Sequence, residues 1–296
     1  VQVDGAWYAA RPAPIGSVVL VRLYAHEIEI RDLKTLALIR RHSATHKGDV
    51  KLPDAERVFN PSRQTRQILA RAEVVDAARV VPGLVIVGIA SHGRAKYETA
   101  ENSGIGSNGL TSARHELLSK YYAEKYPETY DKATPADLAY CGPHRLTDPL
   151  PGSTLTVGQA LLSPTRTYAP YALRLLQALG NQRVKGLVHC SGGGQTKCRR
   201  FGSKVHFIKD NLFPTPPIFA EIARVSGTEA KEMHQVYNMG HRLEVFLEPK
   251  DAEVALRLAA ELGLGAQVIG RTEASTRPDG ANHVTVIKDG QVIAYA

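Results

Sequence analysis

The chain has 296 residues, 43% of them hydrophobic, and a formal net charge of +8 at pH 7. This composition supports one large or two smaller folded domains and argues against a disordered chain. No apolar run approaches the roughly 20 residues of a membrane helix and no basic, apolar leader follows Val1, so we expect a cytoplasmic protein without a membrane partner.

Residues 1–72 are predicted to form a small basic β module. They hold 12 Lys or Arg against 7 Asp or Glu, so most of the positive excess lies here. Residues 17–23 and 27–32 alternate like paired strands joined through Tyr24, Ala25 and His26. Residues 40–51 are basic and turn-rich, and residues 60–72 are predicted to form a helix with its arginines in solvent.

This module resembles the small β-barrel that ends Mu-type insertion-sequence transposases. The resemblance rests on Val-Asp-Gly-Ala-Trp-Tyr at 3–8, Ile-Gly at 15–16, Val-Arg at 21–22 and Ile-Glu-Ile-Arg at 28–31. Those enzymes cut DNA with three carboxylates on a ribonuclease H-like core that precedes the barrel. Because residues 1–72 contain no such core, the resemblance implies DNA binding at most, and a solvated basic face is the alternative.

From residue 74 the pattern changes to alternating strands and helices, which predicts a second domain over 73–296. We expect an α/β sandwich in which helices pack on a mixed sheet. The predicted strands are 84–91, 184–189, 241–247, 266–270 and 283–294, the last with a hairpin turn at 288–291. The predicted helices are 110–126, one from Pro164 that ends before Gly180, 218–225, and 251–262 before Gly263.

A glycine-rich loop precedes the first of these helices. Residues 104–114 read Gly-Ile-Gly-Ser-Asn-Gly-Leu-Thr-Ser-Ala-Arg, between a strand and a helix. Glycines permit close backbone approach, and a helix N-terminus favours an anion, so this order predicts a phosphorylated ligand. The alternative is a flexible loop that merely caps the helix.

A second glycine segment, Ser-Gly-Gly-Gly-Gln-Thr-Lys at 191–197, follows the predicted strand 184–189. Its spacing differs from that of a P-loop, so we reject a kinase-type function. The glycines either line a ligand or only make a turn. His189 is either a hydrogen-bonded core residue, which is the commoner case for one histidine on a strand, or a catalyst, and we expect Cys190 to be a buried structural thiol. Three cysteines, Cys141, Cys190 and Cys198, without C-x-x-C spacing predict neither a disulfide framework nor a metal site.

Residues 73–296 resemble aminoimidazole ribonucleotide synthetase, the phosphoribosylformylglycinamidine cyclo-ligase family. The shared segments are 74–78, 82–83, 88–91, Gly-Ser-Asn-Gly-Leu at 106–110, Leu-Ser-Pro-Thr-Arg-Thr-Tyr at 162–168, His-Cys-Ser-Gly-Gly-Gly at 189–194 and Val-Tyr-Asn-Met-Gly at 236–240. The segments at 163–168 and 237–240 look more like the cyclo-ligase than like selenophosphate synthetase, thiamine-monophosphate kinase or the amidotransferase-type purine enzyme.

The resemblance implies ATP-dependent ring closure of formylglycinamidine ribonucleotide, with Mg²⁺ holding the nucleotide phosphates. It implies no catalytic base or metal ligand that we can assign. The implied substrate and phosphate contacts are Gly106, Ser107, Asn108 and Gly109 around the ribose phosphate; Gly192, Gly193 and Gly194 along the cleft; Asn238, Met239 and Gly240 shaping it; and Thr165 and Arg166 as anion contacts. Each has a packing alternative, which for Arg166 is a salt bridge on a helix surface.

The family's chains also have an N-terminal α/β domain that contributes much of the ATP site and the dimer contacts. Residues 1–72 do not resemble it, and the chain starts without a Met, so we expect only the substrate-side half of an enzyme or a fused fragment. Three functions stay open: part of a cyclo-ligase that forms a homodimer, an inert phosphate-binding module, and a DNA-binding tail on a foreign domain.

Overall fold

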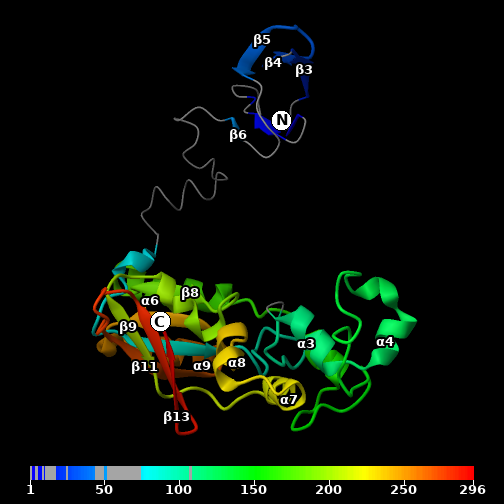
Figure 1. The fold of residues 1–296 in the computed structure, drawn as a ribbon. Helices are drawn as coiled ribbons and strands as arrows, with labels where there is room; N and C mark the ends of the chain where they lie inside the picture. Colours follow the sequence, from blue (N-terminus) through cyan, green and yellow to red (C-terminus); the bar gives the residue numbers. More distant parts are fainter. Residues whose placement is uncertain are drawn as a thin grey trace. The chain divides into compact units, whose positions relative to one another are not determined.

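The computed structural model describes residues 2–3, 6–8, 10, 18–24, 26–43, 50–51, 75–106 and 109–296 (Figure 1). The chain divides into two compact units, Val1–Ala72 and Glu73–Ala296, and each is described by itself. Within the described ranges, no helix combines the length and the apolar character that crossing a lipid bilayer requires.

The N-terminal unit contains two small sheets. β3 (Val19–Leu23), β4 (Glu27–Asp32) and β5 (Leu38–Ser43) form an antiparallel sheet in that order. The other sheet comprises β1 (Gln2–Val3), β2 (Ala6–Tyr8) and β6 (Val50–Lys51). The predicted strand pair is therefore confirmed. Residues 40–42 were wrongly placed in a turn-rich arm, because they belong to β5, which pairs with β4. The helix predicted at 60–72 lies outside the described residues.

The C-terminal unit is built on a mixed seven-stranded sheet, as predicted. Its strand order is β13-β12-β9-β11-β7-β10-β8, and among its neighbours only β12 and β9 run parallel. The strands are β7 (Val85–Ala90), β8 (Gly186–His189), β9 (Val205–Lys209), β10 (His241–Leu247), β11 (Ala266–Ala274), β12 (His283–Lys288) and β13 (Gln291–Tyr295). β7 and β10 lie inside this sheet, and β8 is at one edge.

Helices cover the sheet and extend beyond it. α6 (Ala169–Arg183) and α9 (Ala252–Glu261) bury apolar side chains against Val87 and Val245 on one face. The core of the other face contains Ile86, Phe207 and Phe246. A third core unites α3 (Leu110–Leu117), α5 (Val157–Leu161), α7 (Pro217–Ser226) and α8 (Ala230–Val236). Short 3₁₀ helices occupy Ala77–Arg79, Pro127–Thr129, Gly194–Arg200 and Pro249–Asp251.

Two helix predictions were wrong in their bounds. The helix expected at 110–126 is split into α3 and α4 (Lys120–Lys125), because Leu118 is extended and the Ser119 N–H donates to the carbonyl of His144 at 2.9 Å. The helix expected from Pro164 begins at Ala169, since the Pro164 carbonyl accepts a bond from the Asn102 side chain instead of continuing a helix. Gly180, with φ 71° and ψ 162°, is non-helical and separates residues 169–179 from a short helical end of α6, so the predicted stop at Gly180 is confirmed.

Candidate functional site

Three neighbouring strands bring the glycine-rich segments together at one end of the sheet. β10 is antiparallel to both β7 and β8, with His241 opposite Ala90 and Leu243 opposite His189. The chain therefore leaves β7 and β8, and enters β10, at the same end. The loop after β7, the glycine turn after β8 and residues 238–240 before β10 consequently converge.

The side chain of Asn238 ties these segments to one another. Its Oδ1 accepts from Ser91 Oγ at 2.6 Å and from the Gly240 N–H at 3.1 Å, and its Nδ2 donates to the Gly104 carbonyl at 2.8 Å. Its own carbonyl accepts from the side-chain amide of buried Gln195, beside the glycine turn. Asn238 is buried with all of these bonds made, so it positions the loops.

Glycine is required where the first loop crosses other groups. Gly106 and Gly109 have φ values of +54° and +74°. A Cβ at Gly106 would lie 2.0 Å from Nη1 of Arg242, and one at Gly109 would lie 2.5 Å from the ring of Tyr237. The backbone of this loop thus packs directly against the side chains of Arg242 and Tyr237.

Gly109 is also the N-cap of α3. Ser107 and Asn108, predicted to cradle an anionic group between Gly106 and Gly109, lie outside the described residues. Their part in an anion site stays a prediction.

The second glycine segment turns tightly into a 3₁₀ helix. Gly193 and Gly194 have φ values of +100° and +46°, and a Cβ at Gly194 would lie 2.5 Å from the Tyr237 carbonyl. Gly192 is exposed at the start of this turn. In the third segment, Met239 takes a φ of 50° and buries its side chain in the third core, so the thioether is not presented to solvent.

Arg166 is buried and fully engaged within the protein. Its Nε and Nη2 donate to Glu98 at 2.7 Å each, and its remaining bonds go to the carbonyls of Ala90, His92 and Gly93. These five bonds use every N–H of a guanidinium. In this arrangement Arg166 offers no donor to an anion, and its salt bridge is buried instead of lying on a helix surface.

Sequence reasoning missed a second buried arginine in the same place. Arg242 is 1% exposed and donates to Thr165 Oγ1 at 3.1 Å and to the carbonyls of Gly104 and Ile105 at 3.1 and 2.5 Å. Thr165 itself is exposed. The available signal was the charge itself: an arginine in the predicted strand 241–247, directly after Asn-Met-Gly-His.

A second polar cluster, also missed, lies inside the sheet. Lys209 donates to a Glu244 oxygen and to the Gln195 carbonyl, and His241 Nε2 lies 3.0 Å from the same Glu244 oxygen. Burial raises the pKa of Lys209's partner Glu244, but the Lys209 charge and the bond from His241 outweigh burial and hold that pKa well below its usual range. Burial lowers the pKa of His241. The cluster is therefore charge-balanced by Lys209 and Glu244.

Cys190, His241 and Glu244 place one sulfur, one nitrogen and one oxygen within 4.8 Å of one another. Burial raises the pKa of the Cys190 thiol well above its usual range, so the thiol is neutral and a poor nucleophile. This agrees with the structural thiol expected at this position. The core position expected as the commoner case for His189 was wrong, because β8 is an edge strand and leaves its ring exposed beside Tyr168.

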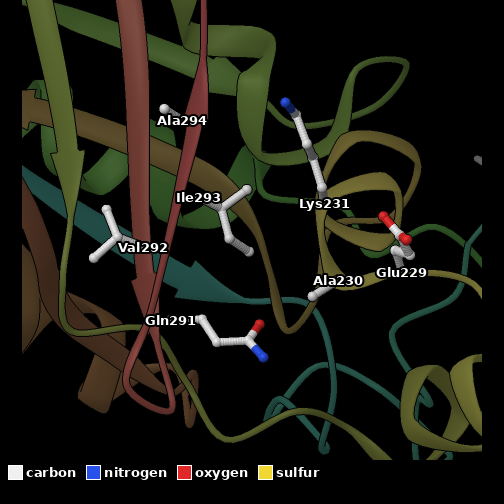
Figure 2. Close-up of a pocket in the computed structure, with 7 residues that line it drawn as sticks. All are labelled: Glu229, Ala230, Lys231, Gln291, Val292, Ile293 and Ala294. Carbon is white, nitrogen blue, oxygen red and sulfur yellow. The ribbon is translucent and has the colours of Figure 1, made fainter.

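Two surface pockets lie near α8. One of about 600 Å³ is lined by Gly193, Glu229, Lys231, Glu232, Gln235 and Val236. Another of about 510 Å³ lies between the start of α8 and β13, where Glu229 and Lys231 stand across from Gln291 and Ile293 (Figure 2). Of the predicted site residues, only Gly193 is among the residues that line these two pockets.

In the N-terminal unit, two arginines are paired with acidic side chains. Glu29 accepts from Arg31 at 2.9 Å and from Arg41 at 2.6 Å. Such pairing reduces the positive charge available to a phosphate backbone. DNA binding by residues 1–72 stays a prediction.

Together these features define a mixed-sheet α/β domain in which glycine segments converge at one end of the sheet over buried arginines. The family described as "AIR synthase related protein, C-terminal domain" matches residues 81–281. The chain belongs to this family.

Named relatives agree with this assignment. A phosphoribosylformylglycinamidine cyclo-ligase of Methanocaldococcus jannaschii is 31% identical over 229 residues, which are 77% of this chain and 56% of that protein. One of Myxococcus xanthus is 31% identical over 213 residues, 70% of this chain and 51% of that protein. The chain spans about half the length of the curated relatives it matches. A solved structure titled "T. maritima PurL complexed with FGAR" aligns with a TM-score of 0.36 at 16% identity, over 75% of this chain and 28% of that one.

Proposed function

We propose that residues 73–296 supply the C-terminal, substrate-side half of a phosphoribosylformylglycinamidine cyclo-ligase. Membership of the family over residues 81–281 carries this proposal. Relatives that bear this name and are about 30% identical support it. Because the match covers little more than half of those relatives, the complete activity requires parts outside the matched region.

The reaction we propose is ring closure to aminoimidazole ribonucleotide. ATP phosphorylates the formyl oxygen of formylglycinamidine ribonucleotide, a substrate nitrogen attacks that carbon, and phosphate leaves. Such a reaction depends on positioning and on stabilising phosphoryl charge. On this chain, residues 106–109 before α3 would hold the ribose phosphate, while Asn238 would fix the loop through its bond to the Gly104 carbonyl. The turn at 192–194 would border the substrate.

ATP and Mg²⁺ enter this proposal through the family alone. Mg²⁺ prefers oxygen ligands in octahedral geometry. Among the described residues, the cluster of three ligand-type side chains offers Cys190, His241 and Glu244, and its carboxylate is already bonded to Lys209. This set does not fit Mg²⁺, so we assign the metal no residue and no step. Homodimer formation likewise remains part of the proposal.

The test is a two-part assay of ATP hydrolysis and aminoimidazole ribonucleotide formation, with formylglycinamidine ribonucleotide and Mg²⁺. The purified chain is assayed alone and after mixing with the N-terminal half of the Methanocaldococcus jannaschii relative. We expect turnover in the mixture and little with the chain alone. The Asn108→Ala variant should lower turnover about 100-fold by loss of positioning. The surface variant Arg257→Gln should leave it unchanged, since Arg257 only pairs with exposed Glu261.

Each other outcome has a definite meaning. A folded chain that yields no product in either arm, yet binds formylglycinamidine ribonucleotide, is an inert phosphate-binding module. A chain that neither turns over nor binds this nucleotide contradicts both the ligase proposal and the module.

A further inference from the structure

Arg242 carries a buried positive charge that no carboxylate balances within the part of the chain that the structure describes. Its acceptors, Thr165 Oγ1 and the carbonyls of Gly104 and Ile105, are all neutral. Its Nε–H is buried and has no hydrogen-bond partner there. Removing an ion from water without a counter-charge costs several kcal/mol, so buried charges in proteins are normally paired.

The groups around Arg242 do not supply the missing negative charge. Burial raises the pKa of Tyr168 and the pKa of the Cys190 thiol, which keeps both neutral. Burial lowers the pKa of His189, and the charges of Arg242 and Lys197 lower that pKa further. The electrostatic surroundings of His189 are therefore positive on more than one side.

The buried Glu244 and the half-buried Glu98 are already paired with other cations. Glu244, two residues along β10, binds Lys209 and His241. Glu98, on the loop after β7, binds Arg166 through both of its oxygens. The positive charge of Arg242 is thus left over after the internal pairs are counted.

The backbone is shaped to place Arg242 where it lies. The register between β10 and β7 shifts between His241 and Leu243, so Arg242 is the additional residue of a β-bulge. Bulges redirect a side chain and are frequent beside functional sites. Gly106, with a φ of +54°, lies so close to the Arg242 guanidinium that a Cβ at this position would overlap it. A bulge and a glycine loop that both accommodate one arginine indicate a built site.

We propose that Arg242 is the counter-charge of a phosphate group that binds beside Thr165 and residues 104–106. The Thr165 oxygen accepts from Nη1 of Arg242, so the exposed Thr165 side chain lies one hydrogen bond from the buried positive charge. This inference rests on the proposed function, because the substrate proposed there carries a phosphate monoester. Free phosphate has the same chemistry, and the experiment separates the two.

The experiment measures binding of inorganic phosphate and of ribose 5-phosphate to the full chain by calorimetry. It also measures the melting temperature in phosphate against sodium chloride of equal ionic strength. A ligand that binds only the folded state raises the melting temperature in proportion to its affinity. We expect saturable binding by the wild type and at least a tenfold weaker affinity for Arg242→Met. Arg257→Gln, which removes one exposed positive charge, should bind as the wild type does.

Two further variants protect the test against misfolding. Arg242→Lys keeps the charge and Thr165→Val removes the hydroxyl, and each should weaken binding at least threefold. If Arg242 only supports the loop, Arg242→Met lowers the melting temperature but leaves the phosphate response intact, which overturns the proposal. Should Arg242→Met not fold, wild-type affinity in both of the other variants overturns it.

The probes also identify the source of the phosphate. Tighter binding of ribose 5-phosphate than of inorganic phosphate indicates a phosphate monoester, and equal binding indicates free phosphate. A wild type that responds to neither beyond the sodium chloride control overturns the inference. If the chain binds phosphate but forms no product, this inference holds and the ligase proposal fails. If it forms product but binds no phosphate, the ligase proposal holds and this inference fails.

Discussion

Two buried arginines at the same end of the sheet have opposite electrostatic situations. Arg166 is 4% exposed, donates all five of its N–H groups to oxygens of the protein and has Glu98 as its counter-charge. Arg242 is 1% exposed, has only neutral acceptors and a buried Nε–H without a partner in the described structure. The difference teaches that burial of a cation does not define its role. What matters is whether a carboxylate of the protein neutralises the buried arginine or whether its charge is left to attract a ligand.

Removing the internally paired arginine should have the largest effect. Arg166→Leu removes five hydrogen bonds and leaves the Glu98 carboxylate without its counter-charge, so we expect the free energy of unfolding to fall by about 3–5 kcal/mol. Urea unfolding followed by circular dichroism measures this loss. The control Arg257→Gln removes an exposed pair between Arg257 and Glu261 and should cost less than about 0.5 kcal/mol. A loss below about 1 kcal/mol for Arg166→Leu would show that the Glu98 pair does not hold the loop.

The glycine against the second arginine provides an intermediate effect. In Gly106→Ala a Cβ would meet the Arg242 guanidinium, and alanine would have to adopt a φ of +54°. We expect a loss of about 1–3 kcal/mol in the free energy of unfolding together with a weaker phosphate response. Gly227→Ala is a matched control, because Gly227 has a φ of +68° but open space where the Cβ would lie. It should cost about 1 kcal/mol and leave phosphate binding unchanged. Equal phosphate affinity in both variants would separate the loop from the anion site.

Much of the sheet could be predicted from local sequence. β10 has its predicted bounds, and the predicted turn between β12 and β13 is present, with Asp289 and Gly290 at positive φ. These features depend on apolar runs and on turn residues, which are local signals. The division of α3 from α4 could not be predicted, since it depends on a bond from Ser119 to His144. Strand β9 and helix α8 were missed.

The candidate site was likewise predictable only in part. Its glycine segments were found because glycine marks backbone that other residues cannot adopt. The roles of Arg166 and Arg242 could not be found, because each depends on partners far away in the chain. Glu98 is 68 residues from Arg166, and the carbonyl of Ile105 is 137 residues from Arg242. A charged residue in a predicted buried strand indicates that a partner or a function is required there, but only the fold identifies which group neutralises the charge.

The smallest effect should distinguish the two arginines by their response to acid. Burial raises the pKa of Glu98, but the bonds from Arg166 and the Ala95 N–H outweigh burial, so its net pKa lies below the ordinary value. A carboxyl with a depressed folded-state pKa contributes stability that is present above its unfolded pKa of about 4.5 and is lost as the pH falls through its folded pKa. The part of the wild type's advantage over Glu98→Gln that depends on pH should therefore be constant near neutral pH, at less than about 1 kcal/mol, and be lost below about pH 4.5. Arg242→Met should show no such change relative to the wild type in phosphate-free buffer, because the acceptors of Arg242 among the described residues are all neutral. Unfolding free energies from pH 7 to 3 measure both differences, and an acid-dependent difference for Arg242→Met would reveal a hidden carboxylate partner and remove the reason to expect an anion there.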